Sequence, residues 1–138
     1  MELRQPVCQT EECSSSQTVS KGFHIVLDIY CQSPRYPNNK DSCLEKLVEE
    51  IIERFSFTCK GSLKYEFSPC GVTLLYLLTE SHVSVHTWPE DNFIAMDIYT
   101  CKSPPCRESI LSFADKIVAF IEDKVDVLYM RISFIKRG

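Results

Sequence analysis

The sequence predicts an α+β domain, built from an antiparallel sheet with two helices packed on one of its faces. Two stretches place apolar residues at helical spacing, one from residue 41 to 57 and one from 106 to 122. Segments rich in β-branched and aromatic residues lie before, between and after them. This order is typical of an α+β sandwich, and a chain of 138 residues has room for one such core.

The N-terminal part of the chain divides into an arm, a strand and a loop. Residues 1–20 are rich in Ser, Thr and Gln, and they hold too few apolar groups to offset the entropy of ordering them. We therefore expect a flexible arm, followed by one domain at 21–138. The first strand is predicted at 23–31 (FHIVLDIYC), and the Pro- and Asn-rich stretch after it predicts a loop.

Both helices are predicted from their apolar period and from the residues at their starts. In DSCLEKLVEEIIERFSF, apolar residues recur every three or four positions from Leu44 onward. Ser42 and Glu45 stand three residues apart at its start, which is the pattern of a capping box. The second helix, 106–122, follows two prolines and carries a broad apolar stripe.

Five further segments are predicted as strands, with turns between them. The apolar run VTLLYLLT is continuous, which is typical of a strand buried on both faces. The segment HVSVHTW alternates, so that His82, Ser84, His86 and Trp88 share one face. The sheet face without helices must also be covered, and dimerisation is one way to cover it. The predicted strands are 57–67, 72–79, 82–88, 93–101 and 125–135.

Composition narrows the class of protein. The formal net charge is −4 and basic residues are scattered, so no basic stripe is offered to nucleic acid. No apolar stretch reaches the ~20 residues of a membrane span, and the first residues lack the apolar segment of a signal peptide. We expect a cytoplasmic protein that does not bind membranes. The eight cysteines include no C-x-x-C pair, which favours reduced thiols over a zinc ribbon or a disulfide framework.

The segment TESHVSVHTWPE, residues 79–90, carries the side chains best suited to chemistry, and the residues alone leave three interpretations open. Its serines and histidines can simply face solvent on a half-buried strand. A metal site would use His82 and His86, with or without Cys101, but the two histidines would lie ~13 Å apart along a strand, too far for one zinc ion. Nucleophilic chemistry would need a group that activates the serine, and no G-x-S-x-G elbow is present.

The same segment resembles the self-processing region of the prokaryotic-type S-adenosylmethionine decarboxylases, which are small pyruvoyl enzymes of polyamine synthesis. The run E-S-H-x-[ST]-[IV]-H-T-W-P-E and a cysteine twenty residues after its first serine are specific to that family. PCGVT (69–73) and GFHIVLDIY (22–30) resemble two further family segments. The resemblance spans roughly residues 22 to 135, and it implies that the chain is a pyruvoyl-dependent decarboxylase.

The resemblance implies that the chain cuts itself between Glu80 and Ser81, leaving fragments of residues 1–80 and 81–138. Ser81 then becomes a pyruvoyl group, which forms a Schiff base with the substrate and replaces pyridoxal phosphate, with no metal ion. In the same way, His86 is implied to transfer the proton during cleavage.

Four further site residues and the assembly are implied by the resemblance. Thr73 supports processing with its hydroxyl group, and Cys101 returns a proton to the substrate's α carbon. Phe67 stacks on the adenine of the substrate, and Glu90 accepts hydrogen bonds from its ribose. The family also implies a homodimer, in which two copies form an αββα sandwich.

The substrate expected from the resemblance is S-adenosylmethionine, which would be converted to its decarboxylated form, the aminopropyl donor for spermidine, and CO2. Two departures from the family leave arginine or ornithine as an alternative amino-acid substrate: Cys70 stands where a tyrosine is frequent, and Glu66 where an arginine is frequent. An alternative of another class is a non-catalytic regulatory paralogue, whose sign would be loss of a catalytic residue. His82 has no assigned role.

Overall fold

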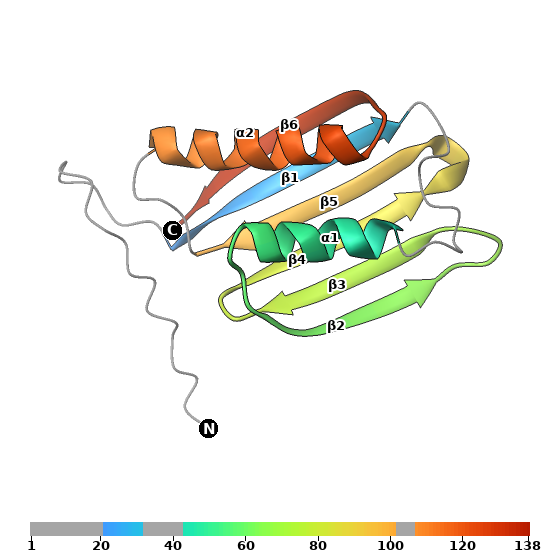
Figure 1. Cartoon of the computed structure of the whole chain (residues 1–138), viewed down its shortest axis with the longest axis horizontal. Helices are drawn as coiled ribbons and strands as arrows, with labels where there is room; N and C mark the ends of the chain where they lie inside the picture. Colours follow the sequence, from blue (N-terminus) through green and yellow to red (C-terminus); the bar gives the residue numbers. More distant parts are fainter. Residues whose placement is uncertain (1–20, 32–42, 102–106) are drawn as a thin grey trace.

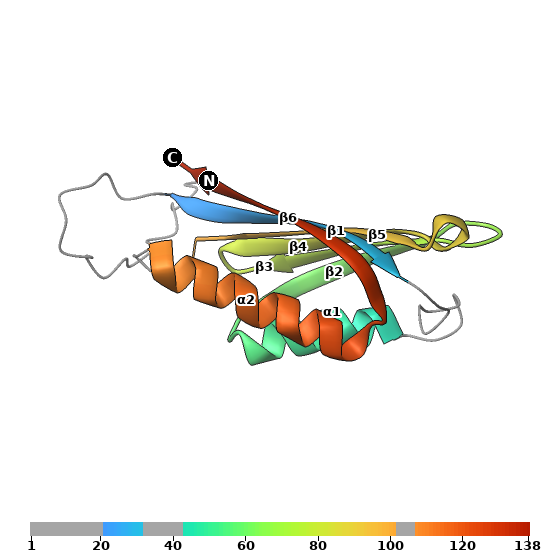
Figure 2. The ribbon, with the colours of Figure 1, turned by 90° about the horizontal axis from the view of Figure 1, so that it is seen from above.

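Six antiparallel strands form one sheet, and two helices lie together on one of its faces (Figures 1 and 2). The computed structural model describes residues 21–31, 43–101 and 107–138. Across the sheet the strand order is β2-β3-β4-β5-β1-β6. Along the chain the elements are β1 (Gly22–Cys31), α1 (Cys43–Arg54), β2 (Cys59–Glu66), β3 (Val72–Leu78), β4 (Ser81–Trp88), a 3-10 turn (Pro89–Asp91), β5 (Phe93–Thr100), α2 (Arg107–Lys124) and β6 (Val127–Arg137).

This architecture confirms the predicted fold class. β2, β3, β4 and β5 follow one another as antiparallel neighbours, as their short connections require. β1 then lies between β5 and β6, so that the first and last strands pair from Gly22 opposite Arg137. The predicted arm at 1–20, Ser42 of the capping pattern and the two prolines before α2 lie outside the described residues.

The core fills the space between the two helices and one face of the sheet. Alternate residues of β1, β4 and β5 point into it, because successive strand side chains project to opposite faces. The apolar stripes of α1 and α2 cover these residues, and each is buried at the period predicted from the sequence. The largest fully buried members are Ile25, Leu27, Ile29, Val48, Ile51, Leu74, Val83, Ile94, Met96, Ile98, Ile117 and Ile121.

The prediction that β3 is buried on both faces is wrong for the single chain. β3 was predicted to be buried on both faces, but only Leu74, Tyr76 and Leu78 are buried. Leu75 and Leu77 remain 44% and 62% exposed. The cause is the one-sided arrangement of the helices, because an antiparallel sheet can leave its second face uncovered. A continuous apolar run therefore does not show that a strand is covered on both faces within one chain.

Several predicted boundaries also shift. α2 runs to Lys124 rather than 122, and the last strand begins at Val127 rather than 125, because the N–H of Val125 still donates to the carbonyl of Ile121 at 2.8 Å. The predicted turn after β4 is one turn of 3-10 helix, ended by Asn92 in a left-handed conformation (φ 51°). Neither described helix is long and apolar enough to cross a membrane.

The packing of α1 on the sheet can be tested with Ile51, which is 0% exposed. Ile51→Ala should lower the free energy of unfolding by about 2–5 kcal/mol, because it leaves a cavity between α1 and the sheet. Glu53→Ala, on the exposed side of the same helix, should change it by less than about 0.5 kcal/mol. Urea denaturation followed by circular dichroism measures both, and equal losses would contradict the assigned core.

Candidate active site

The Glu80–Ser81 peptide lies in the tight connection between β3 and β4. Ser81 is the first residue of β4, and its side chain points to the helix-covered face, where the residue is 8% exposed. Its Oγ is buried and has no hydrogen-bond partner among the described residues. Leaving a buried hydroxyl unpaired costs about 1–3 kcal/mol, and it keeps the lone pairs of the oxygen available for attack. The interpretation of Ser81 as a solvent-facing serine is therefore wrong.

Cys101 lies directly against this peptide. Because Ser81 pairs with Thr100 across β4 and β5, the next residue of the chain, Cys101, reaches the β3–β4 connection. Its Sγ donates to the carbonyl oxygen of Glu80 at 2.9 Å and to the Glu80 carboxylate Oε2 at 3.5 Å. A donor on a carbonyl oxygen stabilises the negative charge that develops there when the carbon is attacked. The structure thus brings together three of the residues predicted from the sequence.

His86 lies at the other end of β4. It shares the helix-free face with His82, Ser84 and Trp88, as predicted from the alternation. Five residues of extended chain separate it from Ser81, which is ~16 Å, and the two side chains point to opposite faces of the sheet. Within one chain, therefore, His86 does not reach Ser81.

The partner of His86 is Thr73. The two residues stand opposite each other in the β3–β4 register, and Thr73 Oγ1 lies 3.0 Å from His86 Nδ1. This hydrogen bond fixes the imidazole ring and leaves Nε2 for another contact. The family resemblance implied only that Thr73 and His86 both take part in processing. The structure shows that the two side chains are in direct contact.

Phe67 and Glu90 lie near the same end of the sheet. The N–H of Phe67 donates to the carbonyl of Gly71 at 2.8 Å, which closes the turn before β3 and leaves the ring 51% exposed. Gly71 occupies φ +103°, a conformation that favours glycine. Glu90 Oε2 accepts a hydrogen bond from Cys70 Sγ at 3.4 Å, and this bond raises the pKa of the Cys70 thiol. The predicted substrate-binding residues therefore lie away from Ser81.

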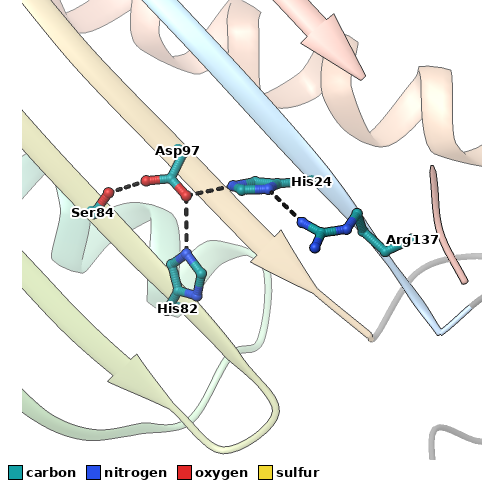
Figure 3. Close-up of polar contacts among 5 residues, drawn as sticks. All are labelled: His24, His82, Ser84, Asp97 and Arg137. Atoms are coloured by element: carbon teal, nitrogen blue, oxygen red, sulfur yellow. Dashed lines mark hydrogen bonds and ion pairs between the residues drawn. The ribbon is translucent and has the colours of Figure 1, made fainter. Parts of the chain in front are cut away.

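The metal interpretation based on His82 and His86, with or without Cys101, is not supported, because His82 and His86 lie four residues apart along β4, ~13 Å, and Cys101 lies at the Ser81 end of that strand. The structure instead places His82 with two residues that sequence analysis missed, His24 and Asp97 (Figure 3). Their positions on the helix-free face follow from strand alternation, but their proximity depends on the pairing of three strands. Four of the described cysteines, Cys31, Cys59, Cys70 and Cys101, have free thiols in the structure.

Comparison with known proteins identifies the family. Residues 23–138 match the family described as S-adenosylmethionine decarboxylase. The chain belongs to this family. The match includes both groups of site residues, those around Ser81 and those around His86, and it confirms the family expected from TESHVSVHTWPE.

Individual relatives of this S-adenosylmethionine decarboxylase family agree with that assignment. An S-adenosylmethionine decarboxylase proenzyme of Thermococcus onnurineus is 35% identical over 117 residues, covering 85% of this chain and 77% of the relative. One from Clostridium botulinum is 30% identical over 118 residues, covering 85% and 94%. The crystal structure of the adenosylmethionine decarboxylase from Aquifex aeolicus superposes with a TM-score of 0.71 at 28% identity, covering 88% of this chain and 93% of that one.

Proposed function

We propose that this protein is a self-cleaving, pyruvoyl-dependent decarboxylase that acts on S-adenosylmethionine. The observation that carries the proposal is the buried, unpartnered Ser81 hydroxyl beside a Glu80 carbonyl that accepts a hydrogen bond from Cys101. Relatives named as proenzymes support cleavage as part of maturation. The three residues Ser81, His86 and Cys101 are all present, which argues against a non-catalytic paralogue.

Cleavage begins when Ser81 Oγ attacks the carbonyl carbon of Glu80. The peptide C–N bond then breaks, the hydroxyl proton moves to the departing nitrogen, and an ester joins the two residues. Removal of the α proton of residue 81 breaks the ester at its Cβ–Oγ bond, leaving a carboxylate on Glu80 and dehydroalanine at 81. Hydrolysis releases ammonia and leaves a pyruvoyl group. The Cys101 thiol supports the first step, because it already donates to the oxygen that becomes negative.

The proton transfers need a base, and the described chain does not bring His86 to its own Ser81. We assign the removal of the α proton of residue 81 to His86 of a second copy, held by its Thr73, because the α hydrogen of a strand residue projects away from its side chain, toward the helix-free face. The two groups of site residues lie at opposite ends of β4, ~16 Å apart. In a two-fold homodimer, the Ser81 end of one copy would meet the His86 end of the other. Each dimer would then contain two composite sites.

The helix-free face of the sheet has the size and composition of a dimer interface. Six strands spaced ~4.8 Å apart and about eight residues long present on the order of 750 Å², close to the ~800 Å² per partner of a standard interface. Packing two such faces together would produce the expected αββα sandwich and would cover the exposed side of β3. The large exposed apolar residues on this face include Leu63, Tyr65, Leu75, Leu77, Trp88 and Tyr129.

The composite site also suits the substrate. Phe67 offers an exposed ring for stacking on adenine, and Glu90 offers a carboxylate for the ribose hydroxyls. After cleavage, the pyruvoyl ketone would condense with the substrate amine and withdraw electrons as CO2 leaves. Cys101, beside position 81, would return the proton to the α carbon. This chemistry needs neither pyridoxal phosphate nor a metal ion.

Glu66, which stands where the family often has an arginine, does not support a different substrate. Glu66 forms an ion pair with Lys64 at 2.9 Å, and Lys64 also pairs with Glu45 of α1. Its side chain therefore lies on the helix-covered face, away from Phe67. The acidic residue at this position therefore does not argue for arginine or ornithine as the substrate, and S-adenosylmethionine remains the favoured one. The cytoplasmic location remains part of the proposal, and the four free thiols Cys31, Cys59, Cys70 and Cys101 are compatible with it.

Cleavage at the Glu80–Ser81 bond is tested by intact mass spectrometry of the purified chain. The wild type should give two fragments, residues 1–80 and 81–138, with a pyruvoyl group blocking the second. Ser81→Ala should stay whole because the attacking oxygen is gone. Ser84→Ala, on the same strand, should be cut normally. A wild-type chain that never cleaves, or cleavage in Ser81→Ala, would contradict the proposed maturation.

The two-chain site is tested by mixing variants that are each defective. His86→Ala should slow self-cleavage at least ~100-fold, the usual contribution of a positioned acid–base group. Co-expression with tagged Ser81→Ala should restore cleavage of the His86→Ala chain, because the Ser81→Ala copy supplies the missing imidazole. A partner carrying both substitutions should not restore it. Mixed dimers without restored cleavage would show that His86 does not act across the interface.

The substrate is tested by release of labelled CO2 from carboxyl-labelled S-adenosylmethionine, arginine and ornithine. Only the first should release CO2 with the mature protein. Glu90→Gln should raise KM for it about tenfold with little change in kcat, since a hydrogen bond to a charged acceptor contributes ~1.5 kcal/mol. Release from arginine or ornithine would change the assigned substrate, and release from none would favour a regulatory role.

A further inference from the structure

Three possible metal ligands meet on the helix-free face of the sheet (Figure 3), opposite the face that holds the Ser81 side chain. His24 Nε2 lies 2.5 Å and His82 Nε2 2.9 Å from the same carboxylate oxygen, Asp97 Oδ2. All three ligand atoms lie within 4.8 Å of one another. We propose that this cluster binds one divalent transition-metal ion of the Zn²⁺ class, for which two imidazoles and a carboxylate are suitable ligands.

The sheet itself builds the cluster. His24 of β1 and His82 of β4 both stand opposite Tyr99 of β5, one on each side, and Asp97 lies two residues before Tyr99 on the same face. The Tyr99 ring stacks on His82 with centroids 5.9 Å apart and meets His24 edge-on at 5.9 Å. These ring contacts restrict both imidazoles without occupying a ring nitrogen. The ligands are therefore held by three paired strands rather than by a loop.

The observed spacing is close to the spacing that a metal ion requires. Ligand atoms ~2.0–2.2 Å from a tetrahedral Zn²⁺ lie ~3.3 Å from one another, so the two N···O distances would widen by less than ~1 Å. Ser84 Oγ donates to the second oxygen of Asp97, Oδ1, which orients the carboxylate. Such outer hydrogen bonds are usual for metal-binding carboxylates. In the single chain the side chain of His82 is 46% exposed, so the open side of the cluster would face the second copy in the proposed dimer.

The contact of Arg137 with His24 disfavours metal binding, and replacing Arg137 tests this effect. Its Nη1 lies 3.3 Å from Nδ1 of His24. Because a guanidinium only donates, Nδ1 accepts and the proton of His24 stands on Nε2, which donates to Asp97. Metal binding through Nε2 needs the opposite tautomer, with the proton on Nδ1, so Arg137 must move away. A side chain that accepts from Nδ1–H would instead stabilise the metal-bound state.

The proposal is tested by titrating the purified full-length protein with Co²⁺, followed by visible absorption. One Co²⁺ per chain should bind with the d–d bands of nitrogen and oxygen ligands, free of the charge-transfer absorption that thiolate ligands add. His82→Gln should weaken this binding more than ~100-fold, beyond the effect usual for an outer partner, and Ser84→Ala by about tenfold. Arg137→Gln should tighten it about tenfold, because the amide oxygen can accept from Nδ1–H.

His86→Gln is the matched control, because it removes a histidine from the same face of the same strand but outside the cluster. It should leave the Co²⁺ spectrum and affinity unchanged, and circular dichroism establishes that each variant is folded. His24→Gln provides an independent removal of one ligand, with the same expected loss as His82→Gln. Spectra that show thiolate ligation only, or equal binding by the wild type and both histidine variants, would overturn the site. None of these readouts depends on self-cleavage or decarboxylation.

Discussion

The packing of both helices on one face of the sheet is the constraint on which the rest of this structure depends. It buries alternate residues of the inner strands, such as Val83 and Val85, and fixes which side chains stay outside. Hydrophobic burial at about 25 cal/mol per Å² makes a one-residue slip of a strand costly, since such a slip would exchange the two faces. The positions of the histidines and of Asp97 on the open face thus follow from apolar residues whose side chains lie on the opposite face.

The same constraint explains why residues close in sequence are separated in space. Ser81 and His86 belong to one short motif, and in a helix five residues span about 7.5 Å. In a strand the rise per residue is more than twice as large, and an odd number of steps reverses the face. A motif of this kind can therefore hold two half-sites rather than one site, and in the proposed dimer the assembly of two copies would complete each site.

Much of the fold could be predicted from the sequence because its signals are local. The helical period of α1, the alternation in HVSVHTW and the turn residues each act within a few positions. The burial of β3 could not be predicted, because an apolar run does not reveal what covers the second face. The contacts of Cys101 with Glu80 and of Thr73 with His86 depend on strand register, which joins residues 21 and 13 positions apart. The cluster of His24, His82 and Asp97 needs two registers at once, and no single segment carries a sign of it.

The strand order has a consequence for the chain after self-cleavage. Residues 1–80 supply β1, β2 and β3, whereas residues 81–138 supply β4, β5 and β6. In the sheet, β1 of the first fragment is inserted between β5 and β6 of the second, with paired residues along both of its edges. The two fragments would therefore stay in one sheet. Separating them would require breaking the backbone hydrogen bonds of β1 to both β5 and β6. The proposed cut of one covalent bond would change the chemistry at position 81 without creating a subunit that can leave.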